Sequence, residues 1–244
     1  MRKIGERFLL IYSGALTAIV AASAIYGFAR PTQKLSVDEL DVQRINLREP
    51  DGTIRLIISD AARSPGILIK GKEYPHPDRK SAGMIFYNDE GTENGGLIFG
   101  GEKTGDGTKR SYGHLSFDAY EQDQTMALES TQDGNDRSTR FKITDYPDYP
   151  ILDLIQVLNA SKDLPKDQQQ KALDAFFAKH GRPVTRLVLG RGLDGSGDNS
   201  VMLGLNDATG KPRILMKVAS DGTPSLEMLD ADGKVISALQ PKQK

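Results

Sequence analysis

Cysteine is absent from the 244-residue chain, and histidine occurs only three times. The absence of cysteine excludes disulfides and thiolate metal sites. A chain of this length still buries a substantial core, so a fold outside the cytoplasm would not require disulfides. His76, His114 and His180 lie far apart and share no metal-ligand spacing, which predicts loop or surface positions for all three.

The chain also lacks the local motifs of the common catalytic classes. It contains no Walker loop, no G-x-S-x-G elbow, no H-E-x-x-H and no G-x-G-x-x-G in a strand–helix setting. Gly195-Ser196-Gly197 lies in a glycine-rich stretch that predicts a loop rather than a nucleophile elbow. These absences favour a non-catalytic protein over an enzyme.

A strong excess of charge of one sign is missing as well. From Pro31 onward the chain has 28 basic and 32 acidic residues, a net charge of −4. Nucleic-acid binding requires a basic face, so this mixed and mildly acidic composition argues against a nucleic-acid partner.

Only one long hydrophobic run is present. Residues 8–29, from Phe8 to Ala29, carry no charge and would form a helix of about 33 Å, enough to cross a bilayer core. Residues 1–7 before it contain Arg2, Lys3 and Arg7, which the positive-inside rule keeps in the cytoplasm. The sequence therefore predicts a single-pass, signal-anchor protein of the bacterial inner membrane, with residues 8–29 in the lipid bilayer and the main domain extracytoplasmic, in the periplasm.

A cleaved secretory signal is the alternative interpretation of this run. Ala22-Ser23-Ala24 would serve as the cleavage exit, but the apolar stretch is longer than such signals usually have. Gly14, Ala18 and Ala22 recur at every fourth position, a spacing that can support dimerisation of membrane helices and that is also common in spans generally.

Beyond the span, short apolar runs alternate with acidic-glycine turns. Glycine adopts positive φ at low cost and aspartate tolerates turn conformations, so such pairs between strands predict hairpins. The pairs are Asp51-Gly52, Glu90-Gly91, Asp106-Gly107, Asp133-Gly134, Asp194-Gly195, Asp221-Gly222 and Asp232-Gly233. Around them apolar residues alternate, as in Ile54, Leu56 and Ile58, which predicts strands with one buried face.

Residues 150–182 break this pattern with helical spacing, which predicts one inserted αα-hairpin ending at Gly181. The expected organisation is a juxtamembrane segment at 30–46, a β-rich domain at 47–149, the helical hairpin, and β-hairpin repeats at 183–244. The predicted fold is thus mainly β, as an antiparallel meander, a sandwich or stacked hairpin repeats. Phe176 and Phe177 on the second helix are a candidate partner-binding anchor if they are exposed.

The densest polar cluster spans residues 88–96. Asp89, Glu90, Glu93 and Asn94 offer hard oxygen ligands suited to calcium, although acidic and amide residues beside glycine are also what a tight turn requires. Carboxylates of residues 118–124 would join the cluster if the two segments converge. Paired carboxylates would also suit glycan binding or hydrolysis.

Two strings in the first β segment carry a resemblance. Arg44-Ile45-Asn46-Leu47-x-Glu49-x-Asp51-Gly52-Thr53-x-Arg55-Leu56 is the first, and Gly83-Met84-Ile85-Phe86-Tyr87-Asn88-Asp89-Glu90-Gly91-Thr92-Glu93-Asn94-Gly95-Gly96-Leu97 is the second. They resemble a group of uncharacterised bacterial proteins in which a hydrophobic N-terminal span precedes a turn-rich β domain. The resemblance covers roughly residues 40–145 and implies no activity.

These patterns together indicate a membrane-anchored β-rich protein of the bacterial envelope that binds or assembles, as a homo-oligomer or with an envelope protein partner. The alternative is an envelope glycan-binding or glycan-hydrolysing module assisted by calcium.

Overall fold

The computed structural model describes residues 2–28, 34–76, 79–192 and 199–239, in two compact units, Met1–Asp41 and Val42–Lys244. Several sequence predictions lie outside the described residues. They are the end of the expected span at Ala29, residues 30–33 of the juxtamembrane segment, and the Asp194-Gly195 turn with the Gly195-Ser196-Gly197 loop.

In the described part of the first unit there is one helix, α1 (Arg2–Phe28). Gly5–Ala24 within it is long and apolar enough to cross a membrane, and no other helix among the described residues is. Leucine, isoleucine and alanine predominate in this stretch, and no residue from Phe8 to Phe28 carries a charge. The composition therefore identifies α1 as a candidate membrane helix, which is either an anchor or a signal sequence.

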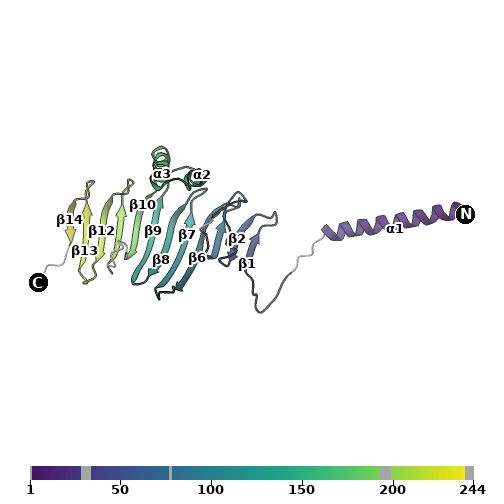
Figure 1. Cartoon of the computed structure of the whole chain (residues 1–244), viewed down its shortest axis with the longest axis horizontal. Coiled ribbons are helices and arrows are strands. Elements are labelled where there is room, and N and C mark those ends of the chain that lie inside the picture. Colours follow the sequence, from purple (N-terminus) through teal and green to yellow (C-terminus); the bar gives the residue numbers. More distant parts are fainter. Residues whose placement is uncertain (1, 29–33, 77–78, 193–198, 240–244) are drawn as a thin grey trace. The chain divides into compact units, whose positions relative to one another are not determined.

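The second unit is built on one antiparallel sheet of 12 strands whose order follows the chain (Figure 1). Its strands are β1 (Arg44–Arg48), β2 (Ile54–Ser59), β5 (Ala82–Tyr87), β6 (Glu93–Lys103), β7 (Lys109–Asp118), β8 (Gln124–Asp133), β9 (Asp136–Asp145), β10 (Val184–Arg191), β11 (Val201–Asn206), β12 (Pro212–Val218), β13 (Pro224–Leu229) and β14 (Val235–Leu239). The mainly β prediction is confirmed, and the arrangement is the antiparallel meander.

Two excursions interrupt the meander. A small hairpin of β3 (Ile67–Ile69) and β4 (Lys72–Tyr74) separates β2 from β5. The helices α2 (Ile151–Ser161) and α3 (Lys166–His180) separate β9 from β10, which confirms the predicted αα-hairpin. Gly181 ends α3 with a φ of 88° and donates its N–H to the Phe177 carbonyl, as expected of a glycine after the last turn.

Seven hairpin turns of the described residues share one hydrogen-bond pattern, and in six of them a glycine occupies the fourth of five positions, whereas the turn at 119–123 has Gln122 there. In the turn from Glu49 to Thr53, the Gly52 N–H reaches the Glu49 carbonyl and the Glu49 N–H reaches the Thr53 carbonyl. Asp51 Oδ1 accepts the Thr53 N–H at 2.9 Å. The φ of Gly52 is 95°, so a glycine bulge here matches the twist of the strands. The six turns are 49–53, 88–92, 104–108, 207–211, 219–223 and 230–234.

The core lies on one face of the sheet. Ile57 on β2 and Ile85 on β5 are buried beneath Leu68 of the β3–β4 hairpin. Further along the same face, Ser116 lines a pocket together with Leu154 and Ile155 of α2. The β3–β4 hairpin and α2 therefore both lie on this side of the sheet, which is called the covered face below.

Candidate functional site

The opposite face of the sheet, called the apolar face below, carries two unbroken rows of cross-strand neighbours. Paired residues of antiparallel strands project to the same side, so the strand registers assign each row to one face. The first row has an apolar residue on every strand: Ile45, Ile58, Met84, Leu97, Leu115, Leu128, Phe141, Leu189, Leu203, Met216, Leu226 and Leu239.

The second row lies two residues further along each strand. Its members are Leu47, Leu56, Phe86, Gly95, Phe117, Met126, Ile143, Leu187, Leu205, Ile214, Met228 and Ser237. Neither row contains a charged residue. The apolar face is therefore a band that crosses all 12 strands without a charge.

Within the described residues, this band is open to solvent. Leu128 is 46% exposed and Met216 is 48% exposed, although each sits in the middle of a strand. Alternation predicted that the apolar side of each strand would be buried, and that expectation is wrong for this face. The physical reason is that the chain's own covering elements, the β3–β4 hairpin and α2, pack on the other side.

The gap at Gly95 in the second row is closed by aromatic rings. Phe86 and Phe117 flank Gly95 in register on the two neighbouring strands, and their rings stack with centroids 5.8 Å apart. Gly95 has a φ of 128°, and a Cβ there would approach the Ser116 carbonyl oxygen to 2.3 Å. Glycine is thus required by the backbone, and the stacked rings restore the continuity of the apolar band.

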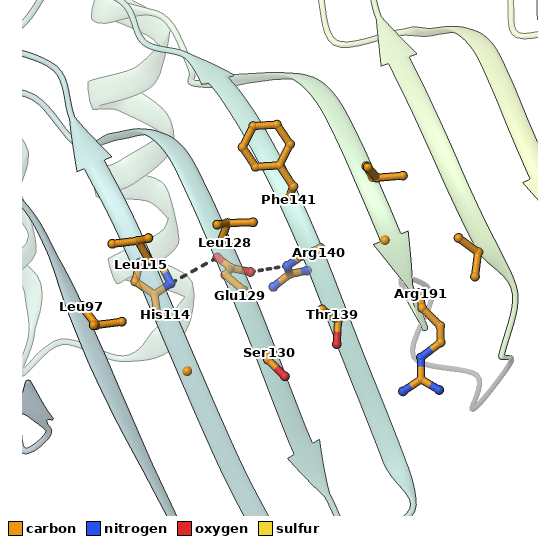
Figure 2. A pocket seen from close by; sticks show the side chains of 14 residues that line it. Leu97, His114, Leu115, Leu128, Glu129, Ser130, Thr139, Arg140, Phe141 and Arg191 are labelled. Atoms are coloured by element: carbon orange, nitrogen blue, oxygen red, sulfur yellow. Dashed lines mark hydrogen bonds and ion pairs between the residues drawn. The ribbon is translucent and has the colours of Figure 1, made fainter.

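Small residues make a hollow beside the centre of the band. In the third row of cross-strand neighbours, Gly113, Ser130 and Thr139 stand next to one another on β7, β8 and β9. The hollow has a volume of about 510 Å³ and is bordered by first-row side chains and by Arg191. Figure 2 shows Leu115, Leu128 and Phe141 side by side on adjacent strands above Ser130 and Thr139.

Charged residues of the same strands gather on the covered face. Glu129 accepts a hydrogen bond from Arg140 Nε, and its Oε1 lies 3.6 Å from His114 Nδ1 (Figure 2). The same oxygen lies 3.5 Å from Lys142 Nζ. Burial raises the pKa of Glu129, but the neighbouring cations outweigh burial and hold it below its usual value. The strands thus place charge on one face and only uncharged side chains in the two rows of the other.

A second candidate site, called the polar pocket below, lies on the covered face under the β3–β4 hairpin and α2. It has a volume of about 350 Å³, and its polar lining includes Arg79, Glu93, Asp118 and Asp123. Arg79 donates two hydrogen bonds to Glu93, at 2.6 Å and 2.9 Å, and both side chains are 16% exposed. This bidentate pair fills one side of the pocket.

The loops around the polar pocket are held together by backbone contacts. Lys70 N donates to Thr92 Oγ1 at 2.9 Å, which joins the β3–β4 hairpin to the β5–β6 turn. Ile151 N, at the start of α2, donates to the Glu121 carbonyl at 2.7 Å. Gln122 Nε2 donates to the Tyr149 carbonyl at 2.6 Å. Sequence segments near 70, 92, 121 and 150 are thereby brought to one place.

Asp118 is the perturbed acid of this pocket. Burial, followed by the charges of Glu93 and Asp123, raises its pKa from 3.8 to about 7, against the opposing effect of Arg79. Its Oδ1 is buried and has no hydrogen-bond partner among the residues that the structure describes. A carboxyl in this environment carries its proton up to neutral pH.

The four predicted calcium ligands have separate partners. Asp89 pairs with Arg55, and Glu90 accepts a hydrogen bond from the Tyr120 hydroxyl at 2.7 Å. Glu93 is held by Arg79, while Asn94 Nδ2 donates to the Asp118 backbone carbonyl at 2.8 Å. Among the described residues no three His, Asp or Glu side chains are grouped to hold a metal ion. Calcium binding at these residues stays a prediction.

The predicted aromatic anchor lies mostly inside the protein. Phe176 is buried, with its ring 5.0 Å from that of Tyr149 and 4.5 Å from that of His180. Phe177 is half-buried, with the Arg182 guanidinium 4.7 Å from its ring centre. Partner binding through this pair stays a prediction, and the ring contacts give both residues a packing role.

No protein-family model and no curated protein matches the chain. The geometry of the apolar face and of the polar pocket is therefore the basis for assigning a function.

Proposed function

We propose that this protein is a non-catalytic binding and assembly platform tethered to the inner membrane of a bacterium by residues 8–29. The sheet lies on the extracytoplasmic side, and the apolar face is the surface that an associating partner covers. The observation that carries the proposal is the pair of uncharged rows that crosses every strand of the sheet.

The size of the apolar face supports this role. Neighbouring strands are about 4.8 Å apart and alternate residues about 7 Å apart, so the band measures about 50 Å by 15 Å. Its area of roughly 800 Å² exceeds the 300–600 Å² of the largest apolar patch on a typical monomer. Burial of this apolar surface would contribute a hydrophobic free energy on the order of 20 kcal/mol. The lost freedom of the two partners and the ordering of their side chains oppose this contribution.

The tether is supported by the composition of α1 and by the charges before it. Arg2, Lys3 and Arg7 precede the apolar stretch, with Glu6 as the opposing charge. Positive residues are retained in the cytoplasm, which leaves the sheet outside. An uncleaved anchor predicts that the protein extracted from membranes has the full mass of 26.7 kDa, whereas a removed signal would give a shorter chain.

Photo-crosslinking tests the proposed association surface. Because the chain has no cysteine, a single introduced thiol carries a benzophenone at one chosen position. Met228→Cys places it in the second row, and Glu227→Cys places it on the opposite side of the same strand. In membranes containing the full chain we expect adducts from position 228 and few from position 227. Equal yields at both positions would contradict the role assigned to the apolar face.

The polar pocket supports a second candidate, binding or hydrolysis of an envelope glycan with help from calcium. Among the carboxyl groups that line this cavity, Asp118 and Glu93 have different environments, since the pKa of Asp118 is about 7 while Glu93 pairs with Arg79. Such a difference is what an acid and a carboxylate need to work on one bond. Thermal melting of the full chain with calcium and with glycan fragments tests this candidate. Unchanged melting in every condition would count against it.

A further inference from the structure

On the basis of the proposed function, we infer that the apolar face is covered by the apolar face of a second copy of this chain. The two sheets then form a sandwich in which each sheet supplies one layer. The inference rests on the area of the band, on its lack of charge, and on the hollow beside it.

The area fits a second copy better than it fits a small apolar ligand. A stable interface of standard size buries about 800 Å² on each partner, which is close to the roughly 800 Å² of the band. The band also extends over the full width of the sheet, from Ile45 on β1 to Leu239 on β14. An acyl chain is only about as wide as one strand spacing, about 5 Å, and would leave most of the band exposed.

The absence of charge makes the band compatible with itself. A two-fold interface brings the same patch of both subunits together, so any charge near the axis would meet a like charge. The two rows have none, and Arg191 at the edge of the hollow is the one charged residue among the third-row neighbours that run from Ala82 to Pro224. Depletion of charge is also typical of the centre of protein interfaces.

The apolar face carries both a protruding side chain and a depression. Phe99, on the strand next to Gly113, is 53% exposed and projects from the same face as the hollow. The hollow of about 510 Å³ beside it has room for a large side chain. In a two-fold contact, the Phe99 ring of each copy can enter the hollow of the other copy, so the same fit occurs twice.

Of two possible two-fold arrangements, the inferred pair adopts the one whose axis is parallel to the row direction. This axis stacks each strand on its own copy and keeps both β1 strands, the first strands after the tether in the chain, at the same end of the sandwich. A two-fold axis parallel to the strands would put the two β1 strands about 50 Å apart at opposite ends, given the strand spacing. In both arrangements the sheets pack face to face about 10 Å apart with nearly aligned strands.

Site-specific crosslinking in membranes distinguishes these possibilities. Single cysteines at three second-row positions sample one edge, the middle and the other edge of the sheet: Leu47→Cys, Ile143→Cys and Met228→Cys. Glu227→Cys, on the covered face beside Met228, is the matched control. A bismaleimide that spans about 10 Å, the separation of packed sheets, is applied to membranes containing the full chain.

The inference predicts a crosslinked species of twice the chain mass at all three apolar positions. We expect the yield of crosslinked dimer at position 228 to be about tenfold higher than the yield at position 227. Crosslinking at Ile143→Cys alone would refute the selected axis. Dimer formation at none of the three would refute the pairing of two copies.

The outcome also separates this inference from the proposed function. If a benzophenone at position 228 attaches to lipid or to a different protein and the bismaleimide gives no dimer, the face is a binding surface and its occupant is not a second copy. If the benzophenone yields no adduct beyond that at position 227, the proposed function itself fails.

Discussion

Asp118→Asn is the change for which the structure gives the sharpest energetic expectation. The folded protein retains a proton on Asp118 up to a pKa of about 7, whereas the unfolded chain loses it near the usual 3.8. Between these values the folded state binds the extra proton, so stability falls as pH rises through the window. The loss is complete above about pH 7 and amounts to about 4 kcal/mol.

Replacement by asparagine removes this loss. We expect Asp118→Asn to equal the parent near pH 3, below both pKa values, and to melt on the order of 10 °C higher at pH 8, since 1 kcal/mol moves the midpoint of a domain this size by about 2–4 °C. Circular dichroism of the full chain in detergent, scanned at each pH, gives both midpoints. Asp136→Asn, at the exposed first position of β9, removes the same charge and should change stability by less than about 0.5 kcal/mol. A parent and an Asp118→Asn variant with equal midpoints at pH 8 would refute the reasoning.

Three further predictions concern the backbone, the buried ion pair and the two faces. Gly95→Ala should destabilise the fold by about 1–3 kcal/mol in the same melting assay because its φ of 128° suits glycine, whereas Gly105→Ala, with nothing within 4 Å, should be nearly neutral. Arg79→Met should lower the free energy of unfolding by about 3–5 kcal/mol, because it leaves the buried Glu93 carboxylate without its cation. A decrease below about 1 kcal/mol, as for an exposed ion pair, would mean that water replaces the arginine. Ala127→Lys, at a fully buried position of the covered face, should prevent folding. Leu128→Lys, on the exposed apolar face, should preserve the melting midpoint and reduce association in membranes. Equal effects of the two substitutions on the melting midpoint would contradict the assignment of one buried and one exposed face.

Local chemistry explains why much of the fold was predictable. The acidic-glycine pairs fix the turns because aspartate oxygens accept backbone N–H groups and glycine adopts positive φ, as at Asp51-Gly52. The helical hairpin was visible from its change of period and from Gly181 at its end. These features act within a few residues of sequence, so pattern analysis detects them without knowledge of the tertiary fold.

The exposure of the apolar face was not predictable from alternation alone. Pairs such as Leu115 and Phe117 indicate a strand with one apolar side, but not which side the rest of the chain covers. That choice depends on where the β3–β4 hairpin and α2 pack, which is a long-range property. One sequence signal did point this way: every strand has an apolar side, whereas the chain outside the strands supplies few apolar residues to cover them.

The sequence left open whether the carboxylates of residues 88–96 and 118–124 converge. In the structure Glu93, Asp118 and Asp123 line one cavity. Asp89 and Glu90 instead face other partners, since the turn projects neighbouring side chains in different directions. Arg79, which neutralises Glu93, was missed because no local pattern connects it to a residue 14 positions away.

The most direct test of the central claim, that the apolar face is covered in the membrane, is the rate at which a water-soluble maleimide labels single cysteines in the full chain. Met228→Cys reports on the apolar face, and Glu227→Cys reports on the other side of the same strand. If the apolar face is covered, Met228→Cys reacts about tenfold more slowly in membranes than Glu227→Cys, and the two rates become equal after denaturation. Labelling of Met228→Cys in membranes as fast as in the denatured protein would show that the face is open to water and would contradict the account.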